Sequence, residues 1–357
     1  MKETNKKLES LGTKVLKEVE AKQNPALDIP IRSLSNIVYD EKTRMLTLGE
    51  KSSKRFLFHT GHAKKFMQTM LIAAFCKELV DQRIHTSLRD TFYALKRTLP
   101  NSQENSFNEQ SESDPIIVDL EVTLDLLREQ LHLNADVRGR VVGDVIVKDK
   151  EDRINWSKLG SGGWAIPSNV EDLQFKKVNA DFCLVIEKNA AFERLHEDKF
   201  WKKHKCILIT TQGQPARGTR RLIQRLATEF NLPVHVFTDM DAYGLYIYSV
   251  LKYGSMSLAH VSDRLGTPNA KFLGLTMDDV DKFKLHNFTI KAEEVDIKRA
   301  NEMLKYKWFQ KPEWQRFLKS LIQRKIKAEL ESLSGRGLKF MTEVYLPQKF
   351  KNKEFLD

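Results

Sequence analysis

The sequence has little cysteine and no long apolar run. Its three cysteines, Cys76, Cys183 and Cys206, are far apart, and no CxxC or Cys/His ligand spacing accompanies them. We therefore expect neither a disulfide framework nor a zinc site. The longest apolar run, residues 70–76, is too short to span a membrane, and the first ten residues lack the apolar core of a signal peptide. These absences favour a cytoplasmic protein.

A nucleotide-binding P-loop is also absent, because no GxxxxGK[ST] motif occurs in the 357 residues. Positive charge, in contrast, is plentiful: 59 lysines and arginines against 48 acidic residues give a formal net charge of +11 and a pI of about 9.3. Such an excess favours polyanionic partners, with nucleic acid first among them. The length is sufficient for two or three domains with cores of their own.

The N-terminal part of the chain mixes helical and strand patterns. Residues 4–22 predict a charged helix that ends before Pro25. The helix carries one apolar stripe, made of Leu8, Leu11, Val15 and Val19. So narrow a stripe favours docking on a partner protein, and packing on the first domain is the alternative. Residues 34–58 predict short strands, so we expect residues 1–60 to form an N-terminal extension.

Residues 61–150 predict three helices followed by a hairpin. The first helix is expected to end near Arg83, and the third to begin at Ile116 after a polar loop. Residues 140–147 predict two short strands around a Gly-Asp turn. Three helices and a hairpin are the order of a winged-helix domain. The glycine-rich stretch that follows predicts a linker over residues 151–177.

Residues 178–357 predict a different architecture, because strands and helices alternate. Strands are expected at residues 182–187, 206–210 and 234–239, each followed by a helix, and a basic helical region follows at 292–334. A βαβαβα order gives a parallel sheet with helices on its faces. The predicted fold class is therefore α/β, or multidomain α+β over the whole chain: a winged-helix domain followed by a Rossmann-like parallel sheet.

Three acidic side chains follow two of these strands. Glu187 follows one apolar run, and Asp239 and Asp241 end the run that starts at Val234. The carboxyl ends of parallel strands meet at one edge of an open α/β sheet, where ligands bind. Carboxylates held this close repel one another unless a cation lies between them, and Mg²⁺ prefers oxygen ligands. A magnesium site for phosphoryl transfer is the leading hypothesis, and capping of the following helices is the alternative.

Tyr93 and Arg89 lie four residues apart, so they share one face of a predicted helix. A free tyrosine has a pKa near 10, so only about one in a thousand is ionised at pH 7. A nearby guanidinium favours the phenolate, or stabilises the charge that builds on a phosphate under attack. Tyr93 is therefore a candidate nucleophile, and a core tyrosine of a helix-turn-helix is the simpler alternative.

Three arginines, Arg217, Arg220 and Arg221, lie at a predicted strand-to-helix junction of the same sheet. Basic groups at a helix N-terminus favour contacts with DNA phosphates. A solvated basic face is the alternative interpretation.

Several segments of the chain resemble the A subunit of type IIB DNA topoisomerase (topoisomerase VI), which is related to the eukaryotic transesterase that opens meiotic double-strand breaks. The resemblance covers nearly the whole chain. Its most specific segments are SLRDTFY (87–93), FNEQSESDPIIVDLE (107–121), LVIEKNAAFERL (184–195), TTQGQPARGTRRLIQRL (210–226), FTDMDAYGLYIYSVLKYGS (237–255) and EVYLPQKF near the end.

For the tyrosine motif, the resemblance implies that Tyr93 attacks DNA, with Arg89 beside it and Phe92 where many relatives carry a second tyrosine. Each tyrosine of a homodimer would cut one strand of double-stranded DNA and give a 5′-phosphotyrosyl break, which the reverse reaction reseals. The tyrosine of one copy is expected to work with the metal site of the other.

For the acidic residues, the resemblance implies a Toprim domain over residues 178–357 whose Mg²⁺ ligands are Glu187, Asp239 and Asp241. A full strand-passage cycle would need an ATPase B subunit in an A2B2 heterotetramer, consistent with the missing P-loop. The chain is then expected to be the DNA-cleaving component of an ATP-hydrolysing type II DNA topoisomerase, DNA-associated and archaeal.

Three other functions stay open at this point. A standalone double-strand-break-forming transesterase would carry the same residues and lack only the ATPase partner. A DxD-type phosphotransferase would use the first aspartate as its nucleophile, but its motif reads DxDG, and Ala242 follows here. A winged-helix DNA-binding protein with a vestigial metal site is the third, and the presence of all three acids and Tyr93 argues against it.

Overall fold

The structure is a computed structural model that describes residues 2–135 and 137–357. Met1, in the predicted N-terminal extension, and Asp136, in the predicted winged-helix domain, lie outside the described residues. The chain divides into two compact units. Unit 1 comprises residues 1–37, 48–136 and 256–260, and unit 2 comprises residues 38–47, 137–255 and 261–357.

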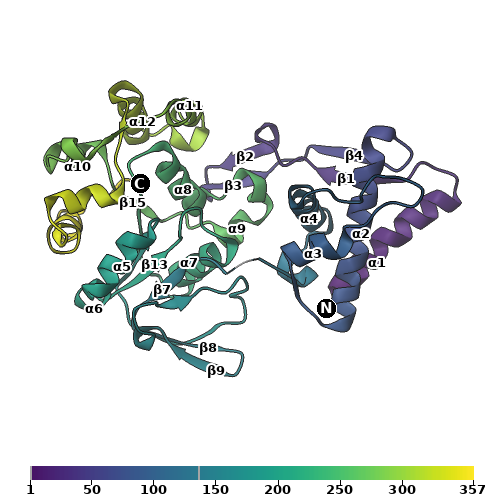
Figure 1. The fold of residues 1–357 in the computed structure, drawn as a ribbon, viewed down its shortest axis with the longest axis horizontal. Helices are drawn as coiled ribbons and strands as arrows, with labels where there is room; N and C mark the ends of the chain where they lie inside the picture. Colours follow the sequence, from purple (N-terminus) through teal and green to yellow (C-terminus); the bar gives the residue numbers. More distant parts are fainter. Residues whose placement is uncertain (1, 136) are drawn as a thin grey trace. The chain divides into compact units, whose positions relative to one another are not determined.

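Unit 1 is mainly helical (Figure 1). Its helices and helical turns are α1 (Lys2–Glu20), η1 (Leu34–Asn36), α2 (Thr60–Gln82), α3 (Leu88–Leu95), α4 (Gln110–Leu124) and η2 (Arg128–Leu131). Its strands are β1 (Ala26–Pro30), β4 (Ser52–Phe56), β5 (Thr86–Ser87) and β6 (Leu133–Asn134). Strands β1 and β4 pair antiparallel, and β5 pairs parallel with β6. Helix α2 packs against α1, α3 and α4, so it forms the centre of this unit.

The three predicted helices are therefore present as α2, α3 and α4, but the predicted start of the third helix is wrong. The sequence predicts a start at Ile116, because residues 101–115 are polar and acidic and show no helical periodicity. Helix α4 instead begins at Gln110 and contains Pro115. The carbonyl of Pro115 accepts a hydrogen bond from Arg32 (2.9 Å), and the same guanidinium pairs with Asp119. Contacts from outside the helix thus help to support its first turns.

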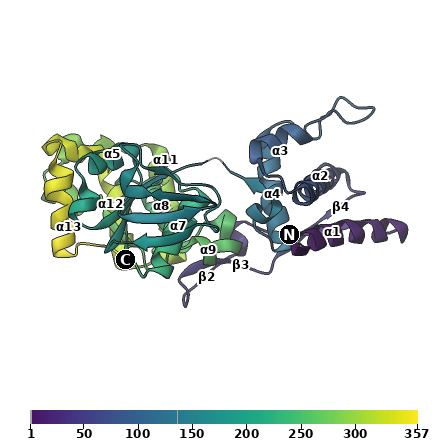
Figure 2. The same cartoon turned by 90° about the horizontal axis from the view of Figure 1, so that it is seen from below.

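Three of the four residues of the apolar stripe on α1 pack on unit 1 and only Val19 is exposed, so the prediction that this stripe docks on a partner protein is wrong. Leu8 and Leu11 are buried in the same cluster as Phe66 and Ile72 of α2, and Val15 packs against that cluster. Figures 1 and 2 show α1 beside α2, with the two helices crossing at an angle. Ion pairs and hydrogen bonds such as Lys77 to Glu9 (3.2 Å) also join the two helices. Helix α1 thus belongs to the core of the unit.

Replacing Leu8 by alanine is expected to destabilise unit 1 by about 2–5 kcal/mol, because it removes buried methyl groups and leaves a cavity. Leu16→Ala, on the exposed face of the same helix (57% exposed), is the matched control and should cost well under 1 kcal/mol. Urea unfolding followed by circular dichroism measures both. Equal midpoints for the two variants would mean that the stripe does not support the fold.

Unit 2 contains the alternating strands and helices. Its first elements are β2 (Ile37–Asp40), β3 (Met45–Leu48), β7 (Arg140–Val142), β8 (Val145–Asp149), β9 (Asp152–Asn155), η3 (Trp156–Lys158), β10 (Trp164–Ala165) and β11 (Gln174–Val178). The β/α run follows: β12 (Phe182–Ile186), α5 (Asn189–Glu197), α6 (Phe200–Lys203), β13 (Cys206–Thr210), α7 (Arg217–Glu229), β14 (Val234–Phe237), α8 (Ala242–Tyr253), α9 (Ser262–Leu265) and β15 (Lys271–Gly274). Residues 37 and 48, at the ends of β2 and β3, fall in unit 1.

The last part of unit 2 is helical with two short strands. It consists of α10 (Met277–Lys282), η5 (His286–Phe288), β16 (Ile290–Lys291), α11 (Glu294–Met303), η6 (Lys307–Phe309), α12 (Pro312–Arg324), β17 (Ile326–Lys327), η7 (Leu330–Arg336), η8 (Met341–Tyr345) and α13 (Leu346–Asn352). A further turn, η4 (Met256–Val261), lies where the chain passes between the two units.

The central sheet of unit 2 has six strands in the order β10-β7-β13-β12-β14-β15. Strands β13, β12, β14 and β15 are parallel, as predicted from the alternation. At one edge, β7 pairs antiparallel with β13, and β10 pairs antiparallel with β7. The three predicted strands are confirmed, each shortened by at most two residues. The parallel part is apolar on both faces because helices cover it, and β12 and β13 are almost fully buried.

The predicted hairpin and linker over residues 140–177 are wrong. Strand β7 pairs with β13 and β10, whereas β8 pairs with β9 and β11 in a separate three-stranded sheet, so β7 and β8 do not form a hairpin with each other. Both belong to unit 2 and not to the helical unit. The supposed linker contains β9, β10 and β11 and a buried core side chain, Trp156, which stacks on Trp164. Within the predicted linker, the glycine-rich turn before β10 is irregular, as a linker would be.

A buried histidine on β14 makes the stability of unit 2 depend on pH. His235 packs against the rings of Phe182, Phe350 and Phe355, and its Nδ1 finds no hydrogen-bond partner among the residues that the structure describes. Burial, with a smaller contribution from Lys271, lowers the pKa of its imidazole to about 4. The unfolded chain binds the proton near pH 6.5, so it binds more protons than the folded chain between these values.

The free energy of unfolding is therefore expected to fall by about 3 kcal/mol as the pH drops from 6.5 towards 4. His235→Phe keeps a ring in the cluster and should remove most of that loss. Chemical unfolding at pH 7 and pH 4.5 measures the difference. The exposed His286, changed to Gln, is the control, and its variant should keep the loss seen in the unmodified protein. A loss that persists in the His235 variant would assign it to other groups.

Candidate active site

The carboxyl ends of β12 and β14 bring three acidic side chains of unit 2 to one edge of the sheet. Ile186 and Phe237 are partners in the parallel register, so the residues that follow them leave the sheet together. Glu187 donates its backbone N–H to the carbonyl of Phe237 (3.0 Å), and Asp239 donates its backbone N–H to Glu187 Oε2 (3.1 Å). Asp241 caps α8 by accepting the Gly244 N–H at 2.6 Å. The predicted convergence of these residues is thus observed.

Gly244 allows α8 to begin directly above Asp239. A Cβ at this position would lie 2.4 Å from the carbonyl oxygen of Asp239 and 3.0 Å from Thr238 Oγ1. Any side chain would therefore push the helix away from the strand end. The glycine keeps the two aspartates on a short, tightly packed connection.

The three carboxylates are poorly accommodated as free anions. Burial, and then the charge of Asp239, raise the pKa of Glu187 to about 8. Burial raises the pKa of Asp239 to about 6, although the Leu330 N–H and Lys188 oppose the shift. Burial also raises the pKa of Asp241, against the hydrogen bond from Gly244. Burial is the largest cause of all three pKa shifts, and a buried carboxylate is one that a bound cation would stabilise in its charged form.

A segment distant in sequence, residues 326–331, closes over this edge. Met240 and Ala328 exchange two backbone hydrogen bonds (2.8 and 3.2 Å), and the Leu330 N–H donates to Asp239 Oδ1 at 2.9 Å. The same segment supplies Glu329 and Glu331. These two residues lie near the Lys188 ammonium, which also pairs with Asp239 Oδ2 at 3.2 Å.

Lys188, Glu329 and Glu331 are members of the site that the sequence does not predict. Lys188 could have been suspected, because it directly follows Glu187 at the ligand-binding edge of the sheet. The two glutamates give no such signal, since they lie far along the chain in a region predicted only as basic and helical. Their approach depends on the β-bridge between Met240 and Ala328.

The donor set suits a hard divalent cation, although the side chains are not arranged around one. Each of the three carboxylates accepts a backbone N–H bond and has a second oxygen. Over residues 2–135 and 137–357, no group of three His, Cys, Asp or Glu side chains is positioned to hold a metal ion. The second oxygen of Asp239 is held by Lys188. The oxygens thus fit Mg²⁺ in kind, and side-chain rotation is needed to bring them together.

Tyr93 lies on α3 of unit 1 and is 58% exposed, so the alternative of a core tyrosine is wrong. Its neighbour Phe92 is buried, with its ring centroid 5.0 Å from that of Tyr93. The guanidinium carbon of Arg89 lies 6.0 Å from the Tyr93 ring centroid, so the predicted pair shares one helix face. Ser87 caps the helix by accepting the Asp90 N–H at 2.9 Å. A hydroxyl in this position is open to a large substrate.

The predicted phosphate contacts of Arg220 and Arg221 are not supported. Arg220 is only 2% exposed, and burial, together with Arg217, lowers the pKa of its guanidinium to about 9. Arg221 makes two hydrogen bonds to the carboxylate of Glu171 (2.7 and 2.8 Å). Both side chains lie on α7, whose buried face could not be identified from the sequence. Arg217 is partly exposed and keeps its predicted role as a hypothesis.

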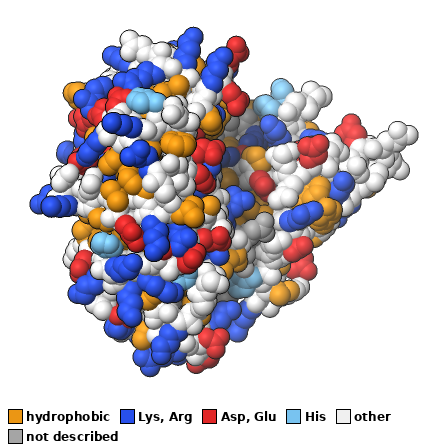
Figure 3. Space-filling view, turned by 60° about the vertical axis from the view of Figure 1, so that its left-hand side comes forward, with side chains coloured by type: hydrophobic (Ala, Val, Ile, Leu, Met, Phe, Trp, Pro, Cys, Tyr) orange, Lys and Arg blue, Asp and Glu red, His pale blue; other side chains and the backbone are white. Residues whose placement is uncertain are grey.

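Basic side chains do not single out one region of the face drawn in Figure 3. Lysines and arginines are spread over that face, with acidic side chains among them. The net charge of +11 therefore supports a polyanionic partner without locating its binding surface. Among the described residues, no helix is long and apolar enough to cross a membrane.

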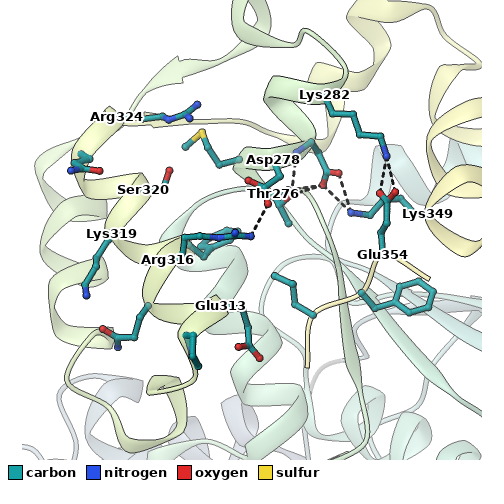
Figure 4. Close-up of a pocket in the computed structure, with 18 residues that line it drawn as sticks. Thr276, Asp278, Lys282, Glu313, Arg316, Lys319, Ser320, Arg324, Lys349 and Glu354 are labelled. Atoms are coloured by element: carbon teal, nitrogen blue, oxygen red, sulfur yellow. Dashed lines mark hydrogen bonds and ion pairs between the residues drawn. The ribbon is translucent and has the colours of Figure 1, made fainter. Parts of the chain in front are cut away.

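A pocket of about 920 Å³ lies elsewhere in unit 2, between α10, α12 and the C-terminal segment (Figure 4). Ion pairs span its wall: Lys282 with Glu354 at 2.7 Å, and Arg316 with Asp278 at 2.8 Å. Lys349 reaches the buried Asp279 at 3.0 Å. These charges compensate one another in pairs, whereas at the sheet edge the single ammonium of Lys188 lies among several carboxylates. The sheet edge and Tyr93 therefore remain the candidate functional residues.

Comparison with protein families decides the assignment. A model of the Toprim domain of the topoisomerase 6 A subunit and Spo11 matches residues 182–350, one described as "Type IIB DNA topoisomerase" matches 64–133, and an "All-beta domain in DNA topoisomerase VI alpha subunit" matches 138–179. The chain belongs to the family of topoisomerase VI A subunits. The last of the three matches covers the strands that the sequence predicts as a hairpin and a linker.

Curated members of the topoisomerase VI A-subunit family are similar over almost their full length. The A subunit of type 2 DNA topoisomerase 6 from Pyrococcus abyssi is 47% identical over 98% of this chain and 94% of its own. The protein of the same name from Pyrococcus horikoshii is 46% identical over the same shares. That from Methanocaldococcus jannaschii is 38% identical over 97% of this chain and 94% of its own. Tyr93 lies within the type IIB topoisomerase match, and the three acids lie within the Toprim match.

Proposed function

We propose that this protein is the DNA-cleaving and rejoining subunit of a type IIB DNA topoisomerase, and that Tyr93 and the acids at the sheet edge perform the reaction. The observation that carries the proposal is the meeting of Glu187, Asp239 and Asp241 at the ends of β12 and β14 within the Toprim match. Carboxylates in this arrangement are suited to phosphoryl transfer with a divalent ion.

In the proposed reaction, the Tyr93 hydroxyl oxygen attacks a backbone phosphorus of double-stranded DNA. A bond forms between that oxygen and phosphorus, the bond from phosphorus to the 3′ oxygen breaks, and the 5′ end stays on the enzyme. The phenolic proton is lost to the surroundings, and the departing 3′ oxygen takes one up. Arg89 faces the same side of α3, where its charge stabilises the phosphate oxygens as negative charge builds on them. Rejoining is the reverse reaction.

The residues proposed to hold Mg²⁺ are Glu187, Asp239 and Asp241. Bound there, the ion supplies positive charge that stabilises the oxygens of the phosphoryl group in transfer. The protein itself supplies one carboxylate oxygen from each residue and holds the other by a backbone N–H. Gly244 and the bridge between Met240 and Ala328 keep the two aspartates in place.

The proposal includes a homodimer and an ATPase B subunit. Cutting both strands of a duplex requires two tyrosines, so two copies of this chain are needed. The tyrosine of one copy is proposed to work with the acids of the other. ATP hydrolysis is assigned to the partner, because the sequence contains no GxxxxGK[ST] motif.

The function is tested by mixing the protein and its B subunit with supercoiled DNA, ATP and Mg²⁺, and stopping the reaction with detergent. The expected products are relaxed DNA and a fraction of linear DNA that carries protein on its 5′ ends. Digestion with 5′ and 3′ exonucleases distinguishes the blocked end. Protein on the 3′ ends, or DNA that is neither relaxed nor cut, would contradict the proposal. Cutting without relaxation would favour the standalone break-forming alternative.

A further inference from the structure

Lys188 carries a positive charge into the acidic edge of the sheet. Its Nζ lies 3.2 Å from Asp239 Oδ2, 3.5 Å from Glu329 Oε1 and 4.0 Å from Glu331 Oε2. It also directly follows Glu187 in the chain. The ammonium is therefore shared between a buried carboxylate, Asp239, and two carboxylates that are about half exposed.

Both oxygens of Asp239 are engaged by the protein itself. Oδ1 accepts the N–H of Leu330 at 2.9 Å, and Oδ2 pairs with Lys188. A cation that binds Asp239 therefore meets a donor already on the oxygen it uses, and at Oδ2 that donor is the ammonium of Lys188, which carries a charge of the same sign. The Leu330 N–H belongs to buried backbone that the bridge between Met240 and Ala328 fixes in place. The Lys188 ammonium is at the end of a flexible side chain that is 30% exposed, so it is the donor that can move away from Asp239.

We propose that Lys188 is a built-in counter-ion of the metal site, which occupies Asp239 until a divalent cation arrives and is then retained by Glu329 and Glu331. This inference rests on the proposed function, because it takes Asp239 as a metal ligand. Lys188 acts through Asp239 and is a positioning residue. The two glutamates are alternative partners for the ammonium, so its release from Asp239 costs little free energy.

The arrangement has two consequences for the protein without DNA. In the absence of metal, the ammonium offsets the repulsion among buried carboxylates, which would otherwise oppose the close approach of β12 and β14. When metal binds, the ion must displace the ammonium, so its apparent affinity is lower than the three acids alone would give. The ammonium thus lowers the affinity of the site for metal and stabilises the site when no metal is bound.

Metal titration of the full chain without DNA tests this inference. Calorimetry with Mg²⁺, or electron paramagnetic resonance with Mn²⁺, gives the dissociation constant Kd. Lys188→Met removes the charge and keeps the stem, so its Kd should be at least about tenfold lower than that of the unmodified protein, which corresponds to about 1.4 kcal/mol. Lys188→Arg restores a cation and should return the Kd towards the unmodified value. Lys202→Met, which removes an exposed charge from α6, is the matched control and should leave the Kd unchanged.

A thermal-melting experiment provides a second readout. In chelator, Lys188→Met should melt at a lower temperature than the unmodified protein, because Asp239 loses its counter-ion. A saturating ligand stabilises the state that binds it in proportion to the logarithm of concentration over Kd, so added Mg²⁺ should raise the melting temperature of the variant by the larger amount. Equal shifts for the two proteins would overturn the inference.

The exposed glutamates supply a variant that does not disturb the buried site. Glu329→Gln removes an alternative partner of Lys188, so it should weaken metal binding. Part of that effect comes from the lost negative charge alone and should persist in any background. The loss should therefore be larger in the unmodified protein than in Lys188→Met, since only the former has an ammonium to retain. Equal losses in both backgrounds would show that Glu329 does not act through Lys188.

The outcomes separate this inference from the proposed function. If Asp239→Asn retains full metal binding, the metal site itself has been misplaced, and the proposed function fails first. If Asp239→Asn abolishes binding while Lys188→Met binds as the unmodified protein does, or more weakly, the counter-ion role of Lys188 is wrong and the metal site stands.

Discussion

Replacing Tyr93 by phenylalanine is expected to abolish the covalent protein–DNA adduct while the fold and DNA binding survive. The substitution removes a single oxygen from a side chain that is 58% exposed. Helix α3 keeps its Ser87 cap and the packing of Phe92. The loss should therefore be specific to chemistry. Detergent-trapped adduct measured on labelled DNA, with melting temperature as the folding control, tests this.

A double variant sharpens the assignment of the nucleophile. Tyr93→Phe combined with Phe92→Tyr moves the hydroxyl by one position, onto a side chain that is only 6% exposed. Adjacent helical residues point about 100° apart, so the moved hydroxyl faces the core of unit 1 and not a substrate. This variant should form no adduct. Restored cleavage would mean that the helix is mobile enough to present either ring, and adduct in Tyr93→Phe itself would remove Tyr93 from the mechanism.

The β/α run of unit 2 could be predicted from the sequence because its signals are local. Strands such as β13 (Cys206–Thr210) are short apolar runs, and buried parallel strands need no alternation. Once strands and helices alternate, chain topology places the strand ends at one edge, so the order of the elements is enough to bring Glu187, Asp239 and Asp241 together. The agreement thus follows from rules about connection handedness and sheet edges.

The region of residues 140–178 could not be predicted for a related reason. Its strands are very short and are separated by turns, so periodicity predicts a hairpin and a linker. Their real partners are distant in sequence: β7 pairs with β13, which follows it by more than sixty residues. Such pairing is set by the packing of Val141 and Val142 inside a sheet and leaves no local pattern.

The sequence also did not predict which charged side chains are buried or paired. Arg220 and Arg221 have the pattern of surface cations at a helix N-terminus, but α7 turns Arg220 into the interior and pairs Arg221 with Glu171. The same limit applies to Lys188: its position after Glu187 is a hint, but its contact with Asp239 cannot be predicted from the sequence. The position of a charged side chain depends on tertiary contacts, such as the approach of Glu329 to Lys188 at the strand end. The pattern of residues along the chain does not reveal such contacts.

Removing one charge from the acidic edge is expected to reduce cleavage by about 10²-fold or more while folding is preserved. Glu187→Gln is the sharpest change, because glutamine keeps the size of the side chain and an oxygen that can accept the Asp239 N–H. It removes the negative charge and replaces the second carboxylate oxygen, which the proposed Mg²⁺ would contact, by an NH2 group, and loss of one such electrostatic contact typically costs this factor. The variant should be at least as stable as the unmodified protein in chelator, since repulsion with Asp239 is relieved.

Asp181→Asn is the matched control for this variant, because Asp181 is an exposed acid at the opposite end of β12. Cleavage as a function of Mg²⁺ concentration should be unchanged in this control and nearly flat in Glu187→Gln. Melting temperature in chelator separates lost chemistry from lost structure. Undiminished cleavage by Glu187→Gln would place the divalent ion somewhere other than the edge formed by β12 and β14. Full cleavage by the unmodified protein in chelator would show that the reaction needs no divalent ion. Reduced cleavage with intact folding would instead tie the reaction to the Glu187 carboxylate, because the substitution changes only its charge and one of its two oxygens.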